Sequence, residues 1–106
     1  MAKLTAETLD NLKARGYVDD ELLAAAAIAA DGTELAVCVS GELVTLVRAD
    51  GEKLFSDSTD RLQNIKVKTG LFKRTLAFTH NGEAFELRVF GGKRLLQYFM
   101  LLAYPQ

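Results

Sequence analysis

Short apolar segments separated by turn signals at regular intervals dominate this chain of 106 residues. The signals are Asp31-Gly32, Ser40-Gly41, Asp50-Gly51, Thr69-Gly70 and Asn81-Gly82, together with a polar run over residues 56–60. Short segments between such turns are typical of β-strands joined by tight hairpins. The sequence therefore predicts an antiparallel meander over about residues 21–90.

The Asn81-Gly82 dipeptide is the strongest local signal, because both residues tolerate the positive φ angles of a two-residue hairpin loop. Such a loop pairs Phe78 with Phe85 and Leu76 with Leu87. The alternating positions then point to the opposite face; they are Thr75, Thr79, Glu86 and Arg88. The hairpin is predicted to have one core face and one solvated face.

The other registers follow if each remaining dipeptide is also a two-residue loop. Ile28 then lies opposite Leu35, Leu35 opposite Leu46, and Leu46 opposite Phe55, which forms an apolar row across four strands. A second row contains Ala26, Val37 and Val44. A slip of one residue would turn these side chains to the other face, so both rows depend on the loop lengths.

Residues 21–30 are rich in alanine, which intrinsically favours helix. The Asp31-Gly32 signal and the alternating segment after it instead favour the first arm of a hairpin. We expect a strand here.

Helices are expected at both ends of the meander. Thr5 is a candidate N-cap between Leu4 and Leu9, which occupy the positions of a hydrophobic staple, and Gly16 ends this helix of about residues 5–15. Residues 93–104 carry apolar side chains at helical spacing. The expected fold is a single mainly β domain over residues 1–106: a strongly bent sheet, or partly open barrel, of about seven strands closed by the C-terminal helix.

Five segments follow one another in a recognisable order: DDELLAAAAI, GELVTLVRADG, LQNIKVKTGLFKRTLAFT, EAFELRVF and KRLLQYFMLL. Over about residues 19–102 this layout resembles the bacterial pleckstrin-homology-like domain. The resemblance implies a bent sheet closed by a helix, in a family that forms oligomers. Pleckstrin-homology domains that bind phosphoinositides tightly carry a basic motif between their first two strands. Here that loop is Asp31-Gly32, so we do not expect this lipid site.

No catalytic or metal-binding constellation is visible. His80 has no spaced acid or nucleophile and is expected to be an exposed residue of the turn. Cys38, the single cysteine, is expected to be a small buried hydrophobe. The adjacent acids Asp19, Asp20 and Glu21 are expected in a solvated loop. Gly91 and Gly92 precede a helix without the spacing of a phosphate-binding fingerprint. We therefore expect a protein that is not an enzyme and that has no cofactor and no metal.

Charge is unevenly distributed along the chain. Residues 1–60 contain twelve acids and five bases, a formal charge of −7, whereas residues 61–106 contain two acids and eight bases, a formal charge of +6. Two solvated faces of one fold, an anionic partner, or contact between opposite poles of two subunits would each explain this asymmetry. With an exposed sheet edge, it leads us to expect self-association. Nucleic acid is not an expected partner, because the whole chain is weakly acidic.

Residues 61–74 carry five bases and no acid. These candidate partner-binding or anion-binding residues are Arg61, Lys66, Lys68, Lys73 and Arg74. Lys66 and Lys68 share a strand face, which Lys73 or Arg74 can join across the Thr69-Gly70 turn. Such a patch can bind an acidic protein, a phosphorylated partner or anionic lipid. Alternatively, lysines on an exposed hairpin only discourage edge pairing.

Leu71 and Phe72 interrupt this basic run. They could insert into a membrane surface or a partner's pocket. Our expectation is that at least one of them begins a core strand.

The sequence thus predicts a non-enzymatic interaction or scaffolding module that docks an acidic partner on the basic hairpin. The alternatives are a small-molecule-binding barrel or enzyme with a hidden site, and weak binding to anionic membrane surfaces. The N-terminus does not resemble a signal peptide, and the longest apolar run is too short to span a bilayer, so a cytoplasmic location is expected.

Overall fold

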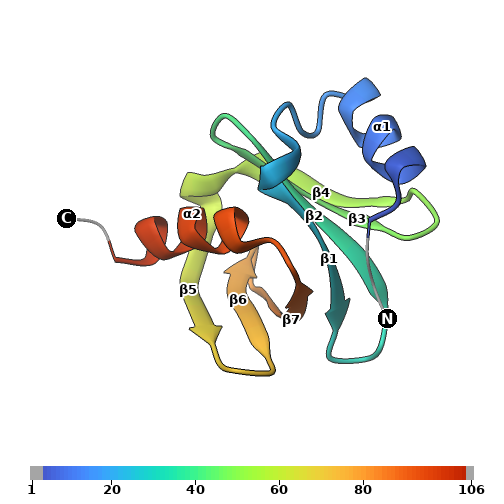
Figure 1. The fold of residues 1–106 in the computed structure, drawn as a ribbon. Coiled ribbons are helices and arrows are strands. Elements are labelled where there is room, and N and C mark those ends of the chain that lie inside the picture. The colour runs from blue at the N-terminus through green and yellow to red at the C-terminus, as the bar shows by residue number, and fades with distance from the viewer. Residues whose placement is uncertain (1–3, 105–106) are drawn as a thin grey trace.

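The computed structural model describes residues 4–104 and contains seven antiparallel strands with a helix near each end (Figure 1). The elements are α1 (Ala6–Ala14), η1 (Glu21–Leu23), β1 (Ala24–Ala29), β2 (Glu34–Ser40), β3 (Leu43–Arg48), β4 (Lys53–Ser58), η2 (Thr59–Arg61), β5 (Leu62–Thr69), β6 (Arg74–His80), β7 (Glu83–Phe90) and α2 (Lys93–Ala103). The predicted mainly β fold with a terminal helix at each end is confirmed.

All seven strands form one sheet in the order β4-β3-β2-β1-β7-β6-β5. Strands β4 and β5 follow one another in the chain but form its two opposite edges, so the sheet is not closed into a barrel. In Figure 1 the sheet bends strongly, and α2 lies across the part formed by β5 and β6. The short 3₁₀ turn η2 connects the two edge strands, β4 and β5.

The β6–β7 hairpin has the predicted register. Phe78 pairs with Phe85 and Leu76 with Leu87. Asn81 and Gly82 both have positive φ, 52° and 81°, as a type I′ turn requires. The strand predicted from the alanine-rich segment is also present, although its first three residues form η1 instead.

The predicted register of the β1–β2 hairpin is wrong by one residue. Leu35 pairs with Ala27 rather than with Ile28. The loop has three residues, 30–32, because the amide of Ala29 bonds the carbonyl of Thr33 and Gly32 adopts a φ of +89°. This is the geometry of a hairpin loop that ends in a glycine bulge. Ile28 consequently lies on the face opposite the main core.

The β2–β3 loop lies one residue later than predicted, at Gly41 and Glu42. Val37 therefore pairs with Leu46 and with Ala25, and both predicted apolar rows are wrong in these strands. The predicted pairing of Leu46 with Phe55 is confirmed, because a bulge between Leu46 and Val47 compensates for a three-residue β3–β4 loop.

Two buried clusters lie on opposite faces of the sheet. The larger one fills the concave face under α2, and its fully buried members include Leu46, Leu76, Phe78, Leu95 and Phe99. The smaller one lies between α1 and the outer face of β1–β3; it contains Leu12, Val18, Ala24, Ala36, Cys38 and Val47. The sheet is thus covered on the concave face by α2 and in part on the outer face by α1.

The ends of α1 are built as the sequence predicts. The Thr5 side chain accepts a hydrogen bond from the amide of Thr8 at the N-terminus. At the C-terminus Gly16 has a φ of +77°, and the amides of Gly16 and Tyr17 bond the carbonyls of Lys13 and Leu12. These two bonds form a Schellman motif, which ends the helix.

Within residues 4–104 no helix is long and apolar enough to cross a bilayer.

Candidate functional site

The five basic residues singled out from the sequence do not share one surface. Lys66 and Lys68 lie on the outer face of β5, since Lys68 pairs with Thr75 while the intervening Val67 pairs with the buried Leu76. Arg61 lies in η2, at the opposite end of β5. The basic run therefore divides between the two ends of the strand.

Lys73 and Arg74 occupy different positions again. Lys73 is exposed in the turn, where its carbonyl accepts the amide of Gly70. Arg74 pairs with Thr69 on the concave side, and its guanidinium donates to the carbonyl of Gly91 over 3.2 Å. Sequence reasoning grouped Arg74 with the lysines, whereas the structure ties it to the segment before α2.

Leu71 and Phe72 form the tip of the β5–β6 turn and are 95% and 90% exposed. The expectation that one of them begins a core strand is wrong. The loop has four residues, 70–73, rather than the two inferred from Thr69-Gly70, so both apolar side chains fall outside the strands. Figure 1 shows this turn at the lower edge of the molecule, away from α1.

A hollow of about 240 Å³ lies beside the exposed turn. Its lining includes three cationic residues, Lys73, Arg74 and Arg88, and no acidic residue. The guanidinium carbon of Arg88 lies 5.3 Å from the centroid of the Phe90 ring, a cation–π contact. Two of the three cations are thus held in place by protein contacts. We call Leu71, Phe72, Lys73, Arg74 and Arg88 the basic tip.

Arg88 was not among the site residues found from the sequence. Two strand registers bring Arg88 near the tip, because Thr75 of β6 pairs with Lys68 of β5 on one side and with Arg88 of β7 on the other. All three residues lie on the outer, solvated face of the sheet. A signal was therefore present in the sequence, but only the combination of two hairpin registers could have shown it.

His80 differs from its expected state as an exposed turn residue. It is 7% exposed, its Nε2 lies 3.0 Å from Oδ2 of Asp57, and its ring stacks on Phe55 with a centroid distance of 4.0 Å. Asp57 also accepts the amide of Ser58. The hydrogen bond from His80 and then that from Ser58 lower the pKa of the Asp57 carboxyl below its ordinary value.

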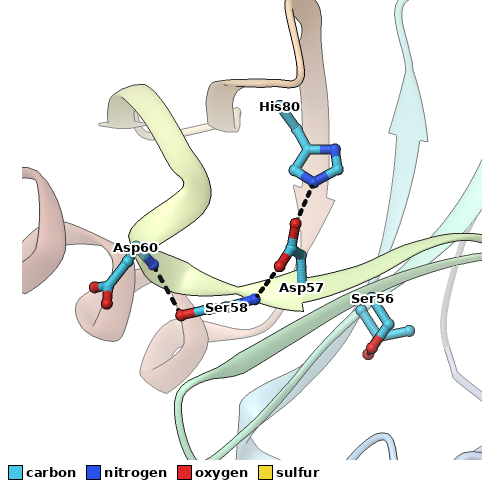
Figure 2. A network of polar contacts seen from close by, with 6 residues as sticks. Ser56, Asp57, Ser58, Asp60 and His80 are labelled. Carbon is cyan, nitrogen blue, oxygen red and sulfur yellow. Dashed lines mark hydrogen bonds and ion pairs between the residues drawn. The ribbon is translucent and has the colours of Figure 1, made fainter.

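Figure 2 shows His80 and Asp57 pointing toward one another from β6 and β4, with Ser56 directed elsewhere. The Ser56 hydroxyl bonds Thr45 instead, over 2.8 Å. Among the described residues, no hydroxyl or thiol bonds the second ring nitrogen of His80. The pair lacks the nucleophile that a histidine-carboxylate dyad would activate, so what this geometry supplies is a polar link between two strands.

Cys38 is fully buried in the smaller cluster, as expected. Burial raises the pKa of its thiol to about 12. A thiol with such a pKa is not a nucleophile near neutral pH.

A cavity of about 290 Å³ lies between α1 and the outer face of the sheet. Its rim includes Arg15, whose guanidinium donates to the carbonyl of Gly51 over 3.1 Å. Within the described part of the chain, no group of three or more histidine, cysteine or acidic side chains could hold a metal ion.

Comparison with known proteins found no matching family model, curated protein or solved structure.

Proposed function

We propose that this domain is a non-enzymatic interaction module that docks an acidic partner through the β5–β6 hairpin. The observation that carries the proposal is the basic tip, where two almost fully exposed apolar side chains lie beside three cationic residues. Isolated exposed apolar residues are common on protein surfaces, but an apolar pair at a protruding turn with like charges around it is typical of a contact surface.

The electrostatic setting supports the same role. No acid occurs between residues 61 and 82 or after residue 86. Of the two acids between these segments, Glu86 pairs with Ala77, which itself pairs with Lys66, so it lies two strands from that lysine. The field around the tip is therefore positive and favours an anionic surface.

Side chains fill the concave face of the sheet, which supports an interaction module rather than the small-molecule-binding barrel that the sequence left as an alternative. A binding barrel needs a lumen, and the concave face here is occupied by Phe78, Phe99 and neighbouring leucines. We also propose, from the sequence resemblance, that the chain is a pleckstrin-homology-like domain; the seven-stranded sheet with a closing helix supports this part of the proposal.

Charge-matched variants test the proposal. Lys68→Gln with Lys73→Gln removes two cations near the tip, and Arg48→Gln with Lys53→Gln removes two from β3 and β4. We expect the wild type and the β3–β4 variant to be retained on immobilised poly-L-glutamate or on anionic vesicles, with retention falling as salt rises. The tip variant should be retained far less. Equal retention of both variants, or retention of none of the three proteins on either probe, would overturn the proposal.

A further inference from the structure

We infer that the acidic partner is an anionic phospholipid bilayer, into whose head-group region Leu71 and Phe72 insert. The inference rests on the proposed docking role of the hairpin and names its partner. It depends on the shape of the basic tip and on how its charges are arranged around the apolar pair.

The apolar pair protrudes. Leu71 and Phe72 are the two most exposed large hydrophobic residues of the described chain, and the next, Leu101, is 68% exposed. A protrusion of two side chains offers little area to a flat protein surface, whereas a bilayer interface surrounds whatever enters it. Transfer of the two apolar side chains from water into that interface is favourable.

The cations lie on both faces of the hairpin behind the tip. Lys68 and Arg88 are on the outer face, whereas Arg74 is on the concave side. A compact acidic group seated in the hollow would contact Arg74 and Arg88 but would leave Lys68 outside it. Anionic head groups surround an inserted turn, so they can reach Lys68 as well as the cations that line the hollow.

The hollow beside the turn has the composition that a lipid phosphate needs. Lys73, Arg74 and Arg88 line it without a carboxylate, and the two arginines are already held by Gly91 and Phe90. Arginine guanidinium groups suit phosphate oxygens because they donate in a planar fork. Head-group contact and apolar insertion can therefore occur together at one tip, where the two attractions add to one another.

The chain contains no tryptophan, so a single introduced indole reports its own environment. In a Phe72→Trp variant, we expect the emission to shift to shorter wavelength with phosphatidylcholine vesicles that contain phosphatidylglycerol, and to stay unchanged with pure phosphatidylcholine. Tyr104→Trp is the matched control, because Tyr104 is also exposed, at 67%, but lies beyond α2. A shift in the control alone, or in neither variant, would overturn the inference.

Vesicle sedimentation provides a second measurement. Replacing Leu71 and Phe72 with serine should weaken binding to anionic vesicles about tenfold or more, whereas the same replacement of Leu101 and Tyr104 should change it less than about twofold. Equal binding by the two variants would contradict insertion. If the wild type is retained on poly-L-glutamate but not on anionic vesicles, the docking role stands and the lipid inference is wrong. If it is retained on neither, the docking role itself fails.

Discussion

His80 on β6 and Asp57 on β4 are joined across the open side of the sheet, with Nε2 of the histidine 3.0 Å from Oδ2 of the aspartate. Their strands are not neighbours, since β3, β2, β1 and β7 lie between β4 and β6 in the sheet order. Phe55 stacks on His80 and also meets Phe78 edge-on. One polar contact and an aromatic stack therefore link edge strand β4 to β6, the neighbour of the other edge strand, in a sheet that its backbone leaves open.

The Asp57 link makes stability dependent on pH. Because the pKa of Asp57 is lower in the folded protein than in the unfolded chain, its stabilising contribution is present above the unfolded value of about 3.9 and is lost as pH falls through the lowered value. We expect Asp57→Asn to lower the free energy of unfolding at neutral pH and to reduce its decline in acid. Urea unfolding at several pH values measures both effects.

Asp60→Asn is the control for this prediction, because Asp60 is exposed and three residues away. It removes the same charge without touching His80. A pH profile that changes equally in the two variants would show that the link does not contribute.

Cys38 should resist alkylation in the folded protein, since its thiol is fully buried and its pKa is raised to about 12. Leu12 of α1 covers the same cluster. We expect iodoacetamide labelling of the wild type only under denaturing conditions. Leu12→Ala, which should cost about 2–5 kcal/mol, should accelerate labelling under native conditions. Mass spectrometry measures the extent of labelling over time. Rapid labelling of the folded wild type would contradict this packing.

Self-association is expected between the acidic and basic parts of two copies. Residues 1–60, which carry a formal charge of −7, include α1 and strands β1 to β4. Residues 61–106, which carry a formal charge of +6, include β5, β6, β7 and α2. Edge strand β4 also exposes Leu54, at 40%. Light scattering at micromolar concentration should show a larger species at low ionic strength that dissociates as salt rises. A monomer at every salt concentration would rule this association out.

Local turn chemistry explains which hairpins the sequence predicts correctly. Asn81 and Gly82 both adopt positive φ, and this combination admits one short loop, so the β6–β7 register followed from the dipeptide alone. Asp31-Gly32 is compatible with loops of two and of three residues. The three-residue loop found here turns Ile28 to the outer face, and no local sequence pattern distinguishes the two loop lengths.

Contacts distant in the chain explain why the burial of His80 was not predicted. His80 was expected to be exposed because its neighbours form a turn, but its burial depends on Asp57 and Phe55, more than twenty residues earlier. Their approach follows from the bend of the sheet, which no single segment encodes. The exposure of Leu71 and Phe72 was missed for a simpler reason: an apolar pair beside a strand resembles the start of that strand until the turn length is known.

Gly92 should be far less tolerant of substitution than Gly91, although both have positive φ, +66° and +71°. A β-carbon on Gly92 would lie 2.6 Å from the β-carbon of Ala25 on β1, whereas one on Gly91 would meet nothing within 4 Å. Gly91→Ala should therefore cost only the left-handed backbone strain of about 1–2 kcal/mol. Gly92→Ala should cost about 1–3 kcal/mol more, because the clash must displace α2 or β1.

Urea unfolding of the two glycine variants measures this difference, and Ala25→Gly isolates its cause. Removing the β-carbon of Ala25 takes away the atom that the new side chain would strike. Gly92→Ala should therefore be less destabilising in an Ala25→Gly background than in the wild type, and this coupling is the difference that a double-mutant cycle reports. Gly91→Ala should cost the same in both backgrounds. If Gly92→Ala also costs the same in both, close contact between β1 and the start of α2 is not what requires glycine at this position.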